Sequence, residues 1–339
     1  MDEPEDAVAE AVVSLLECES ERDINLWPKL AERGLLSVPL PHHYGDGLGI
    51  LGLSAILIEL ATDAVQVPAL TTLGFGVLPL VGAVPESLAQ DVFPAVAQGA
   101  VLTAALSEPG QPFTAQPETV ADRVGGRVRI EGIKVSVPYA DLARWMLVPT
   151  SSGIAIVEMD TSGVTCIQSS YSSSAPEYSV YFDKVMIPEV QIISIDVSKL
   201  LHLALASMGS VAVGLLRGML LMLTELARVR RRFGMADSDF RAVMPGLKDI
   251  HVISGRIEFA SRLVTHIVAQ GEDCIDGRIM GTHLNALNDC ISVQLPAAVS
   301  QGYTFGELMS TDSRLTFDRY LEQAEDLVRW LRGVRVDRS

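Results

Sequence analysis

The segment from residue 200 to residue 216 contains no Asp, Glu, Lys or Arg, and a second apolar stretch follows at residues 219–223. Together the two stretches approach the roughly 20 apolar residues that span a bilayer. His202 and Arg217 interrupt them, however, and the chain continues without a break into Glu225. Outside a membrane, a helix that is apolar on every side lies in the centre of a helical bundle or between subunits. We therefore expect a protein built around this helix, with no membrane span.

The composition is that of a well-buried globular protein. Of its 339 residues, 48% are apolar, enough for two or three domains with sizeable cores. The formal charge of −16 argues against nucleic-acid binding, because displacing counterions from a phosphate backbone needs a broad basic surface. The amino terminus, MDEPEDAVAE, lacks the basic and apolar stretches of a secretory signal, so we expect a cytoplasmic protein.

The residues that could bind a metal are scattered. The cysteines show no Cys-x-x-Cys or Cys/His spacing, and we interpret all of them as reduced core thiols. They are Cys18, Cys166, Cys274 and Cys290. His42 and His43 are neighbours in the loop PLPHHYGDGLG, where adjacent side chains point in different directions, and we interpret them as part of a surface turn. No metal site is expected.

The chain has three successive segments that differ in their hydrophobic pattern. The first hundred or so residues carry apolar side chains at helical spacing, as in AVAEAVVSLLECE and LGLSAILIELATDA. Near Glu118, β-branched and polar residues begin to alternate, and Gly125-Gly126 is suited to a tight hairpin. The last strand is expected at residues 179–188. Helices are then expected over residues 197–233, over 247–269, from 277 onward with a break near Pro296, and over 315–331.

These hydrophobic patterns predict an α+β fold that is mostly helical. We expect an N-terminal helical domain over residues 1–103, a middle β-barrel domain over residues 104–196, and a C-terminal four-helix bundle over residues 197–339. The β-rich segment is thus inserted between two helical ones.

The long helix ends in ARVRRRFGM, which places four arginines within five residues of an otherwise acidic chain. A guanidinium can form two parallel hydrogen bonds with a diphosphate, so this helix end is a candidate anion site. The alternative is a basic helix C-terminus that interacts favourably with the helix dipole and serves no ligand. The residues alone leave both interpretations open.

Four strings follow one another in the chain: LPHHYGDGLG, AALSEPG, FDKVMIP and RVRRRFG. In this order they resemble the loop after the second helix, the Thr/Ser-Glu-Pro loop, the closing strand and the Arg-x-x-Phe-Gly motif of the acyl-CoA dehydrogenase family. The resemblance covers essentially the whole chain. It implies that Arg230 contacts the pyrophosphate of an FAD whose flavin lies in a neighbouring subunit, with Arg232, Phe233 and Gly234 of the same motif beside it.

The family reaction needs parts that this sequence lacks. It removes a proton α to a thioester and passes the β-hydrogen to the flavin, so it needs a carboxylate base and a flavin pocket. Ala204 and Leu331 stand at the positions that the family uses for its base. Ser136 and Pro138 match the Trp and Thr of the family's flavin-side strand, and residues 111–114 replace its usual Ala-Gly-Ser-Asp. Its Gln-x-x-Gly-Gly motif is not recognisable, and we assign no catalytic residue to this chain.

Three further strings, VPALTTLGFGVLP, VLTAALSEPG and KVSVPYADLARWMLV, are similar to one type of family member. This type is the non-catalytic subunit of the heterotetrameric (α2β2) acyl-CoA dehydrogenases of actinobacterial steroid catabolism. The resemblance implies a catalytic partner subunit that binds most of the steroid-CoA thioester and shares FAD with this chain. Two other interpretations stay open: a homotetrameric dehydrogenase with Glu225 or Glu307 as its base, and a scaffold or acyl-CoA-binding protein that has lost FAD.

Overall fold

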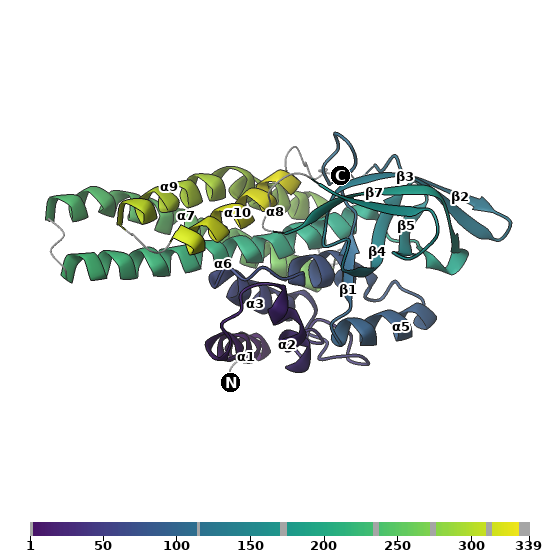
Figure 1. The fold of residues 1–339 in the computed structure, drawn as a ribbon, viewed down its shortest axis with the longest axis horizontal. Helices are drawn as coiled ribbons and strands as arrows, with labels where there is room; N and C mark the ends of the chain where they lie inside the picture. The colour runs from purple at the N-terminus through teal and green to yellow at the C-terminus, as the bar shows by residue number, and fades with distance from the viewer. Residues whose placement is uncertain are drawn as a thin grey trace.

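A computed structural model describes residues 3–113, 116–169, 175–232, 237–271, 276–309 and 314–331. The chain forms an elongated molecule with two sheets at one end and the N-terminal helices along one side (Figure 1). Helices α6 (Val197–Arg232) and α7 (Asp237–Gln270) run side by side and project as an arm at the other end (Figure 1). The predicted α+β fold, with helices, then strands, then helices, is confirmed.

The N-terminal part consists of short helices around an apolar core. Its elements are α1 (Pro4–Cys18), the 3-10 helix η1 (Ile24–Leu26), α2 (Trp27–Glu32), α3 (Gly49–Thr62), the π-helix η2 (Leu70–Val77), α4 (Leu78–Leu80) and α5 (Glu86–Ala97). α3 is apolar on most of its surface because it packs against both α1 and α6. His42 and His43 lie in an exposed turn before α3, as predicted.

Two four-stranded sheets pack face to face, one with the order β1-β4-β5-β8 and the other with the order β2-β3-β7-β6. The strands are β1 (Val101–Ala104), β2 (Val120–Val124), β3 (Arg127–Pro138), β4 (Ala143–Thr150), β5 (Gly153–Glu158), β6 (Val164–Gln168), β7 (Glu177–Pro188) and β8 (Ile192–Ile193). Successive side chains of a strand point to opposite faces. In β4, Trp145 and Leu147 therefore join the helical core, whereas Met146 and Val148 join the core between the sheets.

The predicted hairpin is confirmed. Gly125 and Gly126 connect β2 to β3 with φ of 59° and 77°, the left-handed values that a tight type I′ turn requires. The strand expected at residues 179–188 begins earlier, at Glu177, and it is not the last one. β8 follows it and pairs with β5, but its two residues are too few to show a hydrophobic period in the sequence.

The C-terminal part is a bundle of helices. α6 and α7 are followed by α8 (Gly277–Asp289), the π-helix η5 (Cys290–Gln294), α9 (Leu295–Met309) and α10 (Arg314–Leu331). α7 begins well before the predicted residue 247, and Pro245 lies inside it. The break predicted near Pro296 is a π-helical turn directly before α9. Such a turn makes room for a proline ring that would otherwise clash with the carbonyl group four residues earlier.

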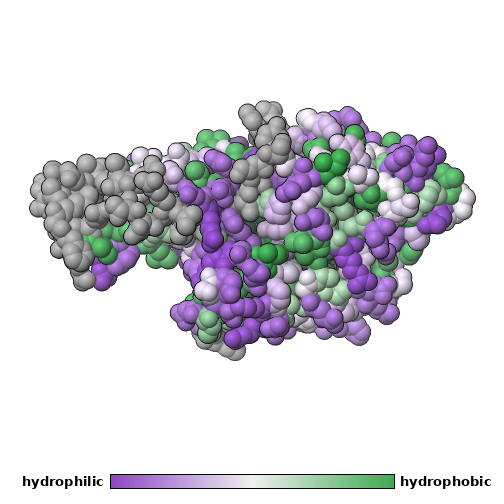
Figure 2. Space-filling model, viewed as in Figure 1, coloured by the Kyte–Doolittle hydropathy of each residue, from purple (hydrophilic) through white to green (hydrophobic). Residues whose placement is uncertain are grey.

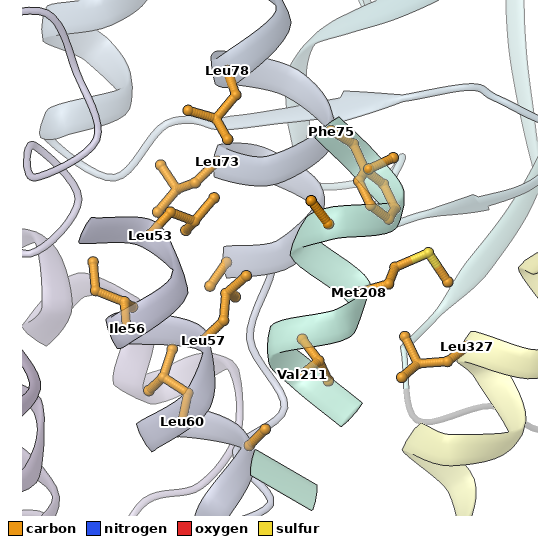
Figure 3. Packing of buried hydrophobic residues seen from close by; sticks show 14 of the residues in the cluster. Leu53, Ile56, Leu57, Leu60, Leu73, Phe75, Leu78, Met208, Val211 and Leu327 are labelled. Carbon is orange, nitrogen blue, oxygen red and sulfur yellow. The ribbon is translucent and has the colours of Figure 1, made fainter. Parts of the chain in front are cut away.

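α6 is the central element of the molecule. In the described part of the chain, one helical segment, Val197–Val229, is long and apolar enough to cross a membrane, but 78% of its most apolar window is buried inside the chain. Figure 3 shows Met208 and Val211 of α6 between Leu57 of α3 and Leu327 of α10. Burial of the apolar segment in a helical bundle, as predicted, is therefore confirmed.

Small residues let α6 approach α3 closely. The hydroxyl groups of Ser54 and Ser210 share a hydrogen bond, with an Oγ–Oγ distance of 2.8 Å. One turn further along α6, a Cβ atom added to Gly214 would lie 2.3 Å from the carbonyl oxygen of Ile58. This seam between the two helices has no room for a larger side chain.

The cysteines are less buried than predicted. Cys18 is exposed at the end of α1, and Cys166 and Cys290 are partly exposed free thiols, because their elements turn only one face to the core. Cys274 lies outside the described residues. Within the described ranges, no group of three or more His, Cys, Asp or Glu side chains is placed to hold a metal ion.

The tight seam between α3 and α6 predicts that two glycine substitutions change the free energy of unfolding in opposite directions. Gly214→Ala should lower the free energy of unfolding by about 1–3 kcal/mol, because the new methyl group forces α3 and α6 apart. Gly255→Ala on α7 is the matched control, since a Cβ atom there meets nothing within 4 Å. It should raise the stability by roughly 0.5–1 kcal/mol through helix propensity. Urea unfolding midpoints measure both changes, and equal effects would contradict a tight seam.

Candidate functional site

A buried ion pair anchors the loop that leads from β1 toward the second sheet. Glu108 accepts hydrogen bonds from Lys134 Nζ at 2.7 Å, from the backbone N–H groups of Glu118 and Thr119 at 2.6 and 3.0 Å, and from the Thr119 hydroxyl at 2.6 Å. The side chains of Lys134 and Glu108 are 0% and 3% exposed. Burial tends to raise the pKa of Glu108, but its four donors hold that pKa below the usual value. The Ser-Glu-Pro loop is thus fixed to β3.

Because the ion pair is buried, removing one of its partners should strongly lower the stability of the protein. Glu108→Gln leaves the Lys134 ammonium buried without its carboxylate and should cost about 3–5 kcal/mol of stability, while Glu108→Gln/Lys134→Met should recover much of the loss. Because the folded pKa of Glu108 lies below the unfolded one, its contribution is fully present above about pH 4.3 and is lost as the pH falls through the folded pKa. Thermal unfolding of the three proteins at several acidic pH values checks both effects. A Glu108→Gln protein as stable as the wild type would contradict this role.

Beyond Lys134, β3 leaves its regular pairing. Its register with β7 shifts between Lys134 and Val137, and Ser136 and Tyr139 have left-handed φ of 50° and 53°. Such values are strained for residues with a side chain and persist only where the surrounding structure fixes them. The Tyr139 N–H donates to the Pro176 carbonyl at 2.9 Å, and burial raises the pKa of the Tyr139 hydroxyl. The irregular strand end therefore places Tyr139 at the chamber, the cavity lined by Tyr139 and by residues of α3, η2, α6 and α10.

Aromatic side chains from separate segments pack together beside the chamber, and one of them, Trp330, lines it. The ring of Phe75 lies edge-to-face at 5.7 Å from Phe113 and at 5.9 Å from Trp330. These distances lie in the preferred range for aromatic pairs. Figure 3 shows Phe75 at the end of η2, against α6. Trp330 donates its Nε1–H to Glu177 at 3.0 Å, which fixes its ring in the chamber.

Two buried carboxylates lie at or beside the chamber, those of Asp326 and Glu177, and both accept hydrogen bonds from Arg329 of α10. Arg329 donates from Nη2 to Glu177 at 2.6 Å and also to Asp326. Although burial opposes its charge, the two carboxylates raise the pKa of Arg329. Sequence reasoning missed this cluster, because Glu177 and Arg329 are 152 positions apart and no motif connects them. With Arg329 and Trp330 bound to it, Glu177 is not free to accept a proton from a substrate.

The positions that the family uses for its base hold apolar side chains. Ala204 is fully buried in α6, and Leu331 is 1% exposed at the end of α10. Neither can accept a proton. Of the alternative bases, Glu225 is 62% exposed on the arm and lies 3.7 Å from Arg228, away from the chamber. The side chain of Glu307 lies outside the described residues.

The arginine run lies at the tip of the arm, far from the chamber (Figure 1). α6 rises about 54 Å from its start beside the sheets to its end, at about 1.5 Å per residue. Arg230 and Arg232 occupy its last turn, and their side chains lie outside the described residues, as do Phe233 and Gly234. The structure therefore places the backbone of Arg230 and Arg232 away from the chamber of their own chain.

Comparison with known proteins gives the family. No protein-family model matches the sequence. The acyl-CoA dehydrogenase FadE28 of Mycobacterium tuberculosis is 33% identical over 329 residues, which cover 96% of this chain and 93% of the relative. The chain therefore belongs to the acyl-CoA dehydrogenase family.

Solved structures share the fold. A variant of the Tcur3481–Tcur3483 steroid ACAD gives a TM-score of 0.83 at 22% identity, covering 96% of this chain and 92% of that chain. The ChsE4–ChsE5 complex from Mycobacterium tuberculosis gives 0.81 at 20% identity, covering 98% and 94%. A glutaryl-CoA dehydrogenase from Mycobacterium smegmatis in complex with FADH2 gives 0.81 at 16% identity, covering 98% and 91%. The predicted acyl-CoA dehydrogenase fold is confirmed.

The chamber of this chain does not fit a flavin. The space left between Tyr139, Val211, Asp326 and Trp330 is a cavity of about 70 Å³. Sites for small molecules measure roughly 300–1,000 Å³. The cavity has room for a few water molecules, not for a flavin ring and a thioester chain.

Proposed function

We propose that this chain is the non-catalytic subunit of a heteromeric, FAD-dependent acyl-CoA dehydrogenase. The complex would introduce an α,β double bond into a steroid side-chain CoA thioester. The observation that carries the proposal is the small size of the chamber, about 70 Å³, beside which Phe75 packs on Trp330 and Arg329 binds the carboxylates of Glu177 and Asp326. A family member without space or base of its own can serve the reaction only through the site of another subunit.

The arm is the part of the chain suited to reach that site. It carries the arginine run away from the body of its own chain (Figure 1). Arg230 would pair with the pyrophosphate of an FAD bound mainly by the catalytic partner, and Arg232, Phe233 and Gly234 would complete the contact. A guanidinium fits this role because its planar fork matches two phosphate oxygens at once.

The structural neighbours support a partner and a substrate class. Two of them are named for pairs of polypeptides, and one of these is described as a steroid ACAD. The α2β2 stoichiometry, the binding of the steroid-CoA thioester mainly by the partner, and the cytoplasmic location belong to the same proposal. A stand-alone homotetramer is disfavoured by the closed chamber. A scaffold that has lost FAD stays the second candidate, because the Gln-x-x-Gly-Gly motif is missing from the stretch that forms η5 and α9.

The closed chamber predicts that the isolated chain has no activity. We expect no turnover of any acyl-CoA with a dye as electron acceptor, and Ala204→Glu should not restore it, because the chamber of about 70 Å³ still has no room for a flavin. Co-expression with a catalytic acyl-CoA dehydrogenase chain should instead yield an active heteromer that contains flavin. Turnover by the isolated chain would refute the proposal and favour the homotetramer.

The proposed role of the arm predicts that replacing Arg230 lowers the affinity of the heteromer for FAD. Arg230→Ala should leave the heteromer assembled but lower its affinity for FAD roughly ten- to a hundredfold, because a charge-assisted hydrogen bond contributes about 1.5–3 kcal/mol. Arg230→Lys should recover only part of the loss, since an ammonium lacks the planar fork. Flavin content after gel filtration measures the effect.

Arg228→Ala is the matched control for Arg230→Ala. Arg228 is 62% exposed, and its nearest acid is Glu225 on the same helix. Its removal should leave the flavin content unchanged. Equal flavin content in the wild type and in Arg230→Ala would mean that the run is a solvated helix end, and the scaffold would then be the better explanation.

A further inference from the structure

The indole of Trp330 is held beside the chamber in the way a bound ligand is held. Trp330 is 5% exposed, and its ring lies edge-to-face on Phe75 with the ring centroids 5.9 Å apart. The polar group of the ring, Nε1–H, donates to the carboxylate of Glu177 at 3.0 Å. Small-molecule sites combine apolar and aromatic contact with a few placed polar groups that fix the orientation of the ligand. The indole has both kinds of contact.

The space available to a ring is larger than the indole itself. The chamber adds about 70 Å³ directly beside Trp330, and apolar side chains of α3, α6 and α10 line it. Among them, Val211 of α6 lies between Leu57 of α3 and Leu327 of α10 (Figure 3). We call the chamber and the adjoining space of the indole the ring site. It has room for a fused ring system larger than indole.

The walls of the ring site are fixed by contacts that do not involve the indole. On the sheet side, the Thr103 hydroxyl donates to the Pro138 carbonyl at 2.7 Å, and the N–H of Tyr139 donates to Pro176 at 2.9 Å. On the helical side, η2 lies so close to α6 that a Cβ atom added to Gly74 would lie 2.9 Å from a side chain of α6. How far a site collapses when a side chain is removed depends on how well its walls can move. These walls should keep their places without the indole.

Strained backbone also surrounds the ring site. Tyr139, which lines the chamber, has a left-handed φ of 53°. Ala64, with φ of 52°, directly precedes Val65 of the chamber lining. Phe113, with φ of 40°, packs on Phe75. Residues with side chains hold such values only where the surrounding structure fixes them, and they cluster at active sites and ligand sites.

The outer surface offers an apolar ring less. Figure 2 shows hydrophobic residues interspersed with hydrophilic ones over the face that it displays, as is normal for a protein surface. A flat apolar ring therefore finds a more continuous apolar contact inside the chain, at the ring site.

We infer that the ring site binds a planar, fused aromatic ring with an N–H donor, and that Trp330 occupies it as an internal ligand. Glu177 selects for the N–H group, because a ring without a donor loses a hydrogen bond to a buried carboxylate. Trp330 is the last residue but one of α10. Helix ends fray, and local opening costs least there. The site is thus closed by the part of α10 that opens most readily.

Trp27 provides a matched comparison. It is also buried, at 4% exposed, and its N–H also donates a hydrogen bond, at 2.8 Å. Its acceptor is the neutral carbonyl group of Gly99, however, and its ring does not line the chamber. Trp27 is therefore a core tryptophan in which burial and a hydrogen bond occur without the ring site.

Binding of free aromatic rings to a glycine variant of the full chain tests the inference. Trp330→Gly should bind indole, and it should bind carbazole at least about tenfold more tightly, because the third ring enters the chamber. Benzofuran has the shape of indole without the N–H group and should bind at least about tenfold more weakly than indole. Carbazole fluorescence measures its own binding, and displacement of carbazole by indole and by benzofuran gives the other two affinities.

Trp27→Gly and the wild-type chain are the controls. Trp27→Gly should not prefer carbazole to indole, because the space beside its ring is not the chamber. The wild-type chain should bind carbazole at least about tenfold more weakly than Trp330→Gly does, since its own indole competes for the site. Equal preferences in the two glycine variants would mean that any lost tryptophan gives the same result, and the inference would fail.

Thermal unfolding with and without carbazole shows whether each variant folds. Trp330→Val removes less of the core and repeats the measurement if Trp330→Gly is unfolded. A folded variant that binds none of the three rings would overturn the inference. Failure of both variants to fold, even with carbazole, would also overturn it, because the walls would then depend on Trp330.

The ring site does not rest on the proposed function. Its test uses the isolated chain without FAD, whereas the proposed function is tested on the heteromer. Loss of carbazole binding would leave the proposed function standing. Failure to form a flavin-containing heteromer would leave the ring site standing.

Discussion

The structure depends on the burial of α6, a helix of 36 residues whose two ends face different environments. Its first half is apolar on every side and must be enclosed, which α3, η2, α9 and α10 achieve. Its second half is polar enough to leave the body and form the arm. The close seam at Ser210 and Gly214 holds the helix against α3. One rigid element thus connects the closed chamber to the arginine run.

The packing around the chamber leaves little free space inside the chain. A core at native packing density does not tolerate a large empty apolar cavity. Here Tyr139 and Trp330 line a chamber of about 70 Å³, Phe75 packs on Trp330, and the hydrogen bond from Trp330 to Glu177 fixes the end of α10 to the start of β7. Under the proposed function, the features that serve the reaction lie on the outside of the chain.

The sequence predicted the features that depend on local patterns. The order of helices and strands and the Gly125-Gly126 hairpin could be read from neighbouring residues, whereas the positions of Ala204 and Leu331 at the family's base came from the resemblance alone. The cluster of Glu177, Arg329 and Trp330 could not, because its members come from distant segments and no motif records their contact. The early start of α7 was missed; Pro245 lies inside this helix, where a proline ordinarily ends or kinks a helix, and the packing against α6 carries the helix through it.

The central claim is that this chain holds no flavin in its own chamber and shares the flavin of a partner. The most direct test is the molar ratio of FAD to protein in the purified heteromer, measured from flavin absorbance after release and from quantitative amino-acid analysis. The account predicts one FAD for every two chains, one of each kind. A ratio of one FAD per chain would contradict it, because the chamber of this chain would then have to open and bind the cofactor itself.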